Sequence, residues 1–342
     1  MKLVPATFLC IALILSCKPT AKKLSETIPT SEFTIAFGSC NKNTLDNFLW
    51  DDVLEADPDI WIWGGDIIYA DTDDAEKIAS MYDAQNKVEG YDLLKAKVPV
   101  IGTWDDHDYG LNDGGVEFKG KKESQQVFLD FMDVGKDSPR RNREGVYAAH
   151  DYDLPEGQIK IIVLDTRYFR TALTPDTESE KRNKPNAYGE GTILGEPQWE
   201  WLADELHNSK AEFNLIVSSV QFLSNEHGFE CWGNFPHEVE KLKKIIVTSA
   251  AKGVIILSGD RHISEFSKTT IDDLSYPLID FTSSGLTHVY SDFKGEPNPF
   301  RVGKVVATES FGLIGIDPKS KRVYFKMIGN NGKVLEELQQ DY

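Results

Sequence analysis

The chain has 342 residues, 40% of them hydrophobic and 27% charged, which is enough apolar material for a sizeable packed core. Its formal net charge of -18 and sequence pI near 4.8 would repel a polyanion, so nucleic-acid binding is not expected. Two of its four cysteines, Cys10 and Cys17, lie close to the N-terminus, and the fold is not expected to depend on disulfides. We expect part of the acidic excess to hold cations.

The first residues have the layout of a secretory signal. Lys2 is followed by an apolar run at residues 8–15 and then by Ser16-Cys17, which resembles a bacterial lipobox. Residues 1–17 are therefore predicted to be a lipoprotein signal peptide, with lipid attached to Cys17, and residues 18–31 a polar tether. The protein is then exported and lipid-anchored to a bacterial membrane, on the periplasmic or the surface face. An ordinary signal peptide cut nearby is the alternative.

In the first half of the chain, apolar β-rich runs alternate with segments of helical spacing. Strands are expected at residues 33–37, 60–63 and 98–104, and helices at residues 45–56 and within 74–97. These strands lead, in order, to Cys40, to Asp66 with Tyr69, and to the stretch Thr103-Trp104-Asp105-Asp106-His107-Asp108-Tyr109. Because ligands collect at the carboxyl ends of strands in α/β sheets, this repetition predicts an active site.

The second half continues the alternation. Strands are expected at residues 146–150, 159–164, 213–222 and 253–257, and helices within 114–132 and at 198–207 and 238–251. The last of these strands leads to Asp260 and His262. The long polar stretch at residues 171–197 is predicted to be a rim or lid over the site. No linker is evident, so residues 32–342 are expected to form one catalytic domain.

The side chains at these strand ends suit metal ions. Thiolate, phenolate and imidazole groups are typical of a ferric or zinc-like position, whereas an all-oxygen cluster is typical of calcium, magnesium or manganese. The mixture predicts two unlike metal positions that share a bridging ligand.

Five motifs in order carry a resemblance to a known family. They are Gly38-Ser39-Cys40, Gly65-Asp66-Ile67-Ile68-Tyr69-Ala70-Asp71, the stretch from Thr103 to Tyr109, Leu164-Asp165-Thr166-Arg167 and Ser258-Gly259-Asp260-Arg261-His262. Together they resemble the alkaline phosphatase D (PhoD-like) family of calcineurin-like metallophosphoesterases, in its compact single-domain branch. The resemblance implies an α/β fold, a four-layer αββα sandwich with a bimetal centre at the strand ends.

The resemblance also implies roles for individual residues. A ferric ion would be held by Cys40, Tyr69, a bridging Asp66 and His262. The second metal, calcium or else magnesium, manganese or zinc, would be held by Asp66, Asp106 and Asp260, with Asp105 as a further ligand or a supporting partner.

The catalytic residues follow from the same motif. His107 is expected to contact the phosphate or to protonate the leaving oxygen, with Asp108 orienting its ring. Arg167 is a candidate for binding the phosphoryl oxygens, or else a structural arginine paired with Asp165.

The predicted activity is hydrolysis of phosphate mono- or diesters by attack of a metal-bound hydroxide. The expected partner is a phosphate-ester small molecule or a phospholipid head group. Alternatives are a phospholipase D-type phosphodiesterase and a non-catalytic calcium-binding surface lipoprotein.

Overall fold

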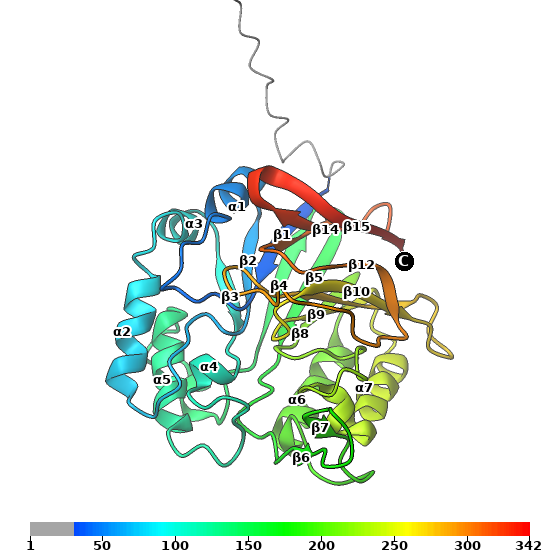
Figure 1. Ribbon diagram of the computed structural model, residues 1–342. Coiled ribbons are helices and arrows are strands. Elements are labelled where there is room, and N and C mark those ends of the chain that lie inside the picture. The colour runs from blue at the N-terminus through cyan, green and yellow to red at the C-terminus, as the bar shows by residue number, and fades with distance from the viewer. Residues whose placement is uncertain (1–30) are drawn as a thin grey trace, which may run out of the picture.

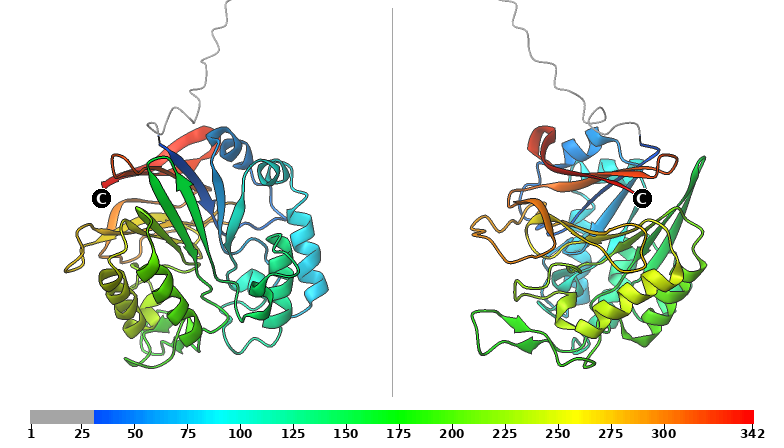
Figure 2. Two further views of the ribbon diagram at one scale, coloured as in Figure 1. Left: turned by 180° about the vertical axis from the view of Figure 1, so that it is seen from behind. Right: turned by 90° about the vertical axis from the view of Figure 1, so that its right-hand side faces the viewer.

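The computed structural model describes residues 31–342, so the predicted signal peptide and, except for its last residue, the predicted tether lie outside the described residues. The chain forms two large sheets packed face to face, with helices on both outer faces (Figures 1 and 2). The four-layer αββα sandwich expected from the sequence is therefore confirmed. None of the helices in residues 31–342 has the length and apolar character that crossing a bilayer requires.

The first sheet has the strand order β15-β14-β13-β1-β2-β3. Its strands are β1 (Phe33–Gly38), β2 (Ile60–Gly64), β3 (Val100–Thr103), β13 (Phe311–Asp317), β14 (Arg322–Gly329) and β15 (Lys333–Asp341). Strands β1, β2 and β3 run parallel, whereas β13, β14 and β15 continue the sheet as an antiparallel meander. The parallel half places three strand ends side by side at one edge.

The second sheet has the strand order β12-β10-β11-β9-β8-β5-β4. Its strands are β4 (Ala148–Leu154), β5 (Gly157–Val163), β8 (Phe213–Val217), β9 (Val254–Ser258), β10 (Ser264–Thr269), β11 (Leu278–Ser283) and β12 (Arg301–Val306). Strands β5, β8, β9 and β11 are parallel.

Helices cover the two outer faces. Those on the first sheet are α1 (Trp50–Ala56), α2 (Ala75–Gln85), α3 (Tyr91–Lys97) and α5 (Lys121–Phe131), and those on the second are α6 (Gly195–Asn208) and α7 (Pro236–Ser249) (Figure 2). The short helix α4 (Asp106–Tyr109) follows β3. Single helical turns lie at η2 (Pro139–Asn142), η3 (Trp232–Asn234) and η4 (Asn330–Gly332).

Strand periodicity divides the core into layers. In β2, Ile60 and Ile62 point between the two sheets, whereas Trp61 and Trp63 point outward under the helices. Burying large apolar side chains on both faces explains why β2 reads as a continuous hydrophobic run rather than as an alternating one.

Several expected bounds differ from the structure; the strand expected at residues 213–222, for example, ends at Val217. The helix expected at residues 45–56 begins only at Trp50, after a loop that leaves Leu45 and Phe48 exposed. The polar stretch at residues 171–197 contains a small hairpin, β6 (Thr174–Pro175) and β7 (Asn183–Lys184), which projects at the bottom of Figure 1. A strand pair of two residues each is too short for a periodicity signal.

The packing between the sheets predicts a specific sensitivity at Gly312 in β13. The Phe37 ring lies over this glycine and meets Phe281 of the other sheet edge to face, with ring centroids 4.8 Å apart. A Cβ atom at Gly312 would lie 2.1 Å from Phe37 Cε1, so Gly312→Ala should lower the free energy of unfolding by about 1–3 kcal/mol through overpacking.

The measurement is urea unfolding of the variant beside Gly135→Ala, whose Cβ would meet nothing within 4 Å. The Gly135 variant should differ from wild type by less than about 0.5 kcal/mol. Equal stability of the two variants would show that Phe37 can move aside.

Candidate metal centre

Loops after four strands converge on one site. Cys40 follows β1, Asp66 follows β2, Asp106 follows β3, and Asp260 with His262 follows β9 of the facing sheet. All five were predicted from the sequence as metal ligands, and the structure brings them together.

The backbone at this site is unusual. Four of the converging residues have positive φ angles, which side-chain-bearing residues rarely adopt: Cys40 (57°), Asp66 (52°), Asp260 (67°) and His262 (56°). Such conformations cost free energy and persist where the surroundings enforce them, often at functional sites. Gly65 and Gly259 allow the close approach, since a Cβ on Gly65 would lie 2.5 Å from Asp105 Cβ and one on Gly259 2.6 Å from Ser39 Oγ.

Three overlapping sets of side chains could each hold a cation, because one ligand atom from each member lies within 4.8 Å of the others. The sets are Cys40 with Asp66 and His262, Asp66 with Asp106 and His107, and Asp105 with Asp106 and Asp260. Asp66 belongs to two sets and Asp106 to two. This overlap is the arrangement expected of two neighbouring cation positions that share carboxylate ligands.

The donor atoms around Asp66 support the first position. Asp66 Oδ2 lies 3.5 Å from Cys40 Sγ and 3.3 Å from the Tyr69 hydroxyl, so thiol and phenol face the same carboxylate oxygen. His262 Nδ1 lies 2.7 Å from the carbonyl oxygen of His288. Donation from Nδ1 to that carbonyl leaves Nε2 with a free lone pair, as in a metal-ligating histidine.

Two carboxylate oxygens support the second position. Asp105 Oδ2 and Asp106 Oδ1 are buried and have no hydrogen-bond partner among the described residues. Buried polar atoms are nearly always paired, and an unpaired carboxylate oxygen is costly. A cation bound by Asp105, Asp106 and Asp260 would satisfy both atoms, so the residues present fit a metal ion.

Burial makes negative charge unfavourable here without a cation. Desolvation raises the pKa of Cys40 to about 12 and that of Asp105 to about 8, and it raises those of Asp66 and Asp260 well above the ordinary range. Burial acts in the same direction on Asp106, but Arg167 and His107 bring its pKa below the ordinary value. Ligation requires deprotonated groups, so cation binding and proton release are coupled at this site.

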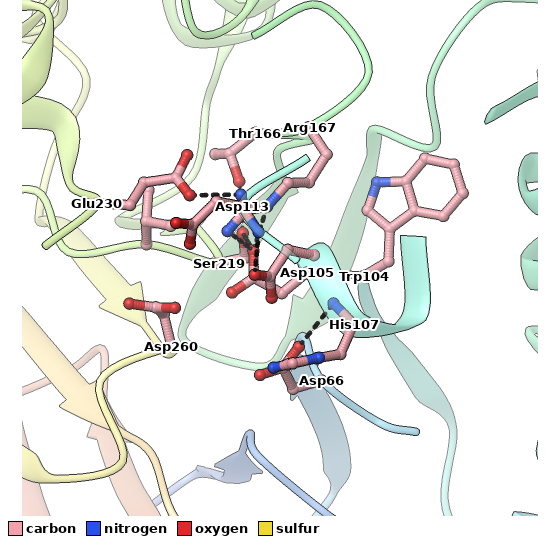
Figure 3. Close-up of polar contacts among 12 residues, drawn as sticks. Asp66, Trp104, Asp105, His107, Asp113, Thr166, Arg167, Ser219, Glu230 and Asp260 are labelled. Atoms are coloured by element: carbon pink, nitrogen blue, oxygen red, sulfur yellow. Dashed lines mark hydrogen bonds and ion pairs between the residues drawn. The ribbon is translucent and has the colours of Figure 1, made fainter. Parts of the chain in front are cut away.

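Arg167 lies beneath the carboxylates rather than at the surface of the site. Its side chain is fully buried, with Nε 2.5 Å from Asp105 Oδ1 and Nη1 2.5 Å from Glu230 Oε2 (Figure 3). Asp165 accepts hydrogen bonds from the backbone of Arg167 and from Trp104 Nε1, and it is not the partner of the guanidinium. The expected pairing with Asp165 is therefore wrong.

This placement also disfavours the phosphoryl-binding role predicted for Arg167. Two carboxylates already occupy its guanidinium, and no part of the side chain is exposed. In this structure Arg167 acts on Asp105 instead: it holds Oδ1, together with Ser219, and leaves Oδ2 to face the second cation position.

The residue that orients His107 differs from the one expected. His107 Nδ1 lies 2.8 Å from Asp71 Oδ1. Asp108 instead accepts hydrogen bonds from the backbone nitrogens of Asp105 and Ile67, which fixes the turn into α4. The prediction that Asp108 orients the ring is wrong, because a helical residue next to His107 points to a different side of the turn.

Several residues at the site were missed from the sequence. The backbone nitrogen of Asp113 and Asn112 Nδ2 donate to Asp106 Oδ2, at 2.6 and 3.1 Å. Arg182, from the hairpin within residues 171–197, pairs with Asp113 and lines the same pocket of about 190 Å³. The expectation that the polar stretch forms a rim thus has a structural counterpart in Arg182.

The sequence is similar to those of known phosphatases. A sequence model of the PhoD-like phosphatases matches residues 35–297. Alkaline phosphatase D of Bacillus subtilis (strain 168) is 23% identical over 226 residues, which cover 59% of this chain but only 38% of that protein.

Two solved structures share the fold. One, described as the structure of PhoD, has a TM-score of 0.72 at 17% identity and covers 91% of this chain and 69% of that one. The other, a dimetal phosphatase from Danio rerio, has a TM-score of 0.56 at 15% identity and covers 92% and 100% of the two chains. The resemblance noted in the sequence is confirmed, and the chain belongs to the PhoD-like phosphatase family.

Proposed function

We propose that this protein is a metal-dependent phosphoesterase that hydrolyses phosphate mono- or diesters. The observation that carries the proposal is the pair of buried oxygens on Asp105 and Asp106 that have no partner among the described residues, together with His107, which lines the same pocket as Asp106. A site that only stores a cation has no need of an oriented histidine, whereas ester hydrolysis needs a proton donor for the leaving oxygen.

Cys40, Asp66, Tyr69 and His262 would hold the first metal, for which we propose ferric iron. Asp66, Asp106 and Asp260, with Asp105, would hold the second, for which we propose calcium, with magnesium, manganese or zinc as alternatives. When bound, the two ions supply Lewis-acid stabilisation of phosphoryl oxygens and lower the pKa of water.

The residues of the chain supply the remaining chemistry. Water attacks phosphorus opposite the leaving oxygen and releases one proton to the solvent, the P–O ester bond breaks, and His107 donates a proton from Nε2 to the departing oxygen. Asp71 holds Nδ1 and stabilises the protonated ring. Arg182, half exposed where it lines the pocket, is placed to bind a phosphoryl oxygen, the role first expected of Arg167.

The domain plan and the location of the protein are part of the proposal. Residues 32–342 would form the catalytic domain, tethered by residues 18–31 to lipid on Cys17 after removal of the signal peptide. The enzyme would act outside the cytoplasm on an extracytoplasmic phosphate ester or a phospholipid head group.

Elemental analysis and hydrolysis of bis(p-nitrophenyl) phosphate test the proposal together. Purified protein should hold two metal ions per chain and turn over the diester. Asp66→Ala should lose both metals and abolish turnover, because a shared ligand serves both positions. Asp46→Ala, which removes an exposed carboxylate outside the site, should leave both unchanged. Protein with bound calcium but no turnover would identify a cation-binding protein instead of an enzyme.

His107→Asn should retain both metals and lower kcat by about two to four decades, the usual contribution of a positioned general acid.

Asp71→Asn should lower kcat by about ten- to a hundredfold, since it removes only the group that orients the ring. Asp73→Asn is the exposed control nearby. Metal loss in the His107 variant would instead make His107 a ligand, as its nearness to Asp66 and Asp106 allows.

Arg182→Gln should lower kcat/KM by about ten- to a hundredfold through loss of a charge-assisted hydrogen bond to the substrate. Lys184→Gln, on the same hairpin and paired with Glu178, should have little effect. Equal kinetics for the two variants would exclude Arg182 from substrate binding.

A further inference from the structure

A second cavity adjoins the metal centre. It has a volume of about 410 Å³ and is lined by Phe229, Arg261, His262, His288, Val289 and Tyr290. Phe229, Arg261 and His262 also line the pocket formed by the predicted ligands Asp66, Asp106 and Asp260. The two cavities therefore share a wall, and a molecule with its phosphate at the metal ligands can extend into the second cavity.

The wall of this second cavity is apolar and rich in π systems. Phe229 and Tyr290 are aromatic residues with exposed fractions of 37% and 42%. The Arg261 guanidinium lies 4.2 Å from the centroid of the Phe229 ring, and it is neutralised by Glu296, with both oxygens 2.9 Å from Nη2. Among the described residues that line the cavity there is no carboxylate. This chemistry suits an uncharged aromatic group.

The position of the cavity indicates which part of a substrate it receives. It touches His262 but not His107, which lines only the neighbouring pocket. The Tyr69 ring lies near a histidine of each cavity, with its centroid 4.2 Å from that of His107 and 5.6 Å from that of His288. The leaving oxygen must lie at His107, so the second cavity opens on the side of the retained ester group.

We propose that the cavity between Phe229 and Tyr290 binds the retained ester group of a phosphodiester, and that this group is aromatic and uncharged. The inference rests on the proposed phosphoesterase function and narrows it to diesters with a flat aromatic substituent. Ring contacts with Phe229 and Tyr290 supply the selectivity, while Arg261 keeps the Phe229 ring in place.

The test uses diesters with one leaving group, p-nitrophenolate, and three retained groups: phenyl, cyclohexyl and methyl. Wild-type protein should show a kcat/KM for the phenyl ester about five- to tenfold above those for the other two, the size expected of one aromatic contact pair. Since the leaving group is constant, the ratio reports the retained group alone. Hydrolysis of the methyl ester tests the proposed function independently of this inference.

Variants locate the selectivity. Tyr290→Ala and Phe229→Leu should bring the phenyl-to-methyl ratio close to one, whereas Tyr290→Phe should preserve it. Phe48→Ala, which removes another exposed aromatic residue, at 66% exposure and outside this cavity, should leave the ratio at the wild-type value. Hydrolysis of all three esters at equal kcat/KM, or a cyclohexyl ester as good as the phenyl ester, would overturn the proposal. Absence of turnover of every ester would instead contradict the phosphoesterase function.

Discussion

The main constraint on this structure is the cost of burying several carboxylates where the two sheets meet. Carboxylate oxygens of Asp105, Asp106 and Asp260 lie within 4.8 Å of one another, and one of Asp66 lies within 4.8 Å of one of Asp106. Asp66, Asp105 and Asp106 are buried, so water screens their repulsion poorly. Arg167 supplies one positive charge through its ion pair with Asp105, and a second ion pair with Glu230 offsets part of that charge. The remaining negative charge needs cations from the open side. Cation binding would therefore stabilise the folded state, and the proposed activity would use the same cations.

The two sheets meet this constraint in different ways. The first presents three parallel strand ends side by side, and their loops carry Cys40, Asp66 and Asp106. The second contributes Asp260 and His262 from the loop after β9. Positive φ angles at four of these five residues turn their side chains toward a common point, at a cost in backbone free energy. The extensive apolar layer between the sheets offsets that cost and keeps the ligands from separating.

Charged side chains and aromatic side chains lie in different cavities around this centre. Carboxylate and imidazole groups line the smaller pocket, where charge is needed. Aromatic rings line the adjoining cavity, where a neutral group can be selected without disturbing the buried charges. A substrate that spans both cavities would bring its phosphorus to the ligands through contacts made away from them, which is how binding energy becomes available for positioning.

The sequence predicted the family, the alternation of strands and helices, and the identity of the candidate ligands. It could do so because strand-end motifs are local: Cys40, Asp66, Asp106, Asp260 and His262 each sit a fixed few residues past an apolar run. Tertiary structure alone decided which side chains pair. Asp71 rather than Asp108 meets His107, and Glu230, 63 residues further along the chain, meets Arg167. Such contacts depend on which loops approach one another in the folded chain. The spacing of residues within one strand or helix carries no information about that approach.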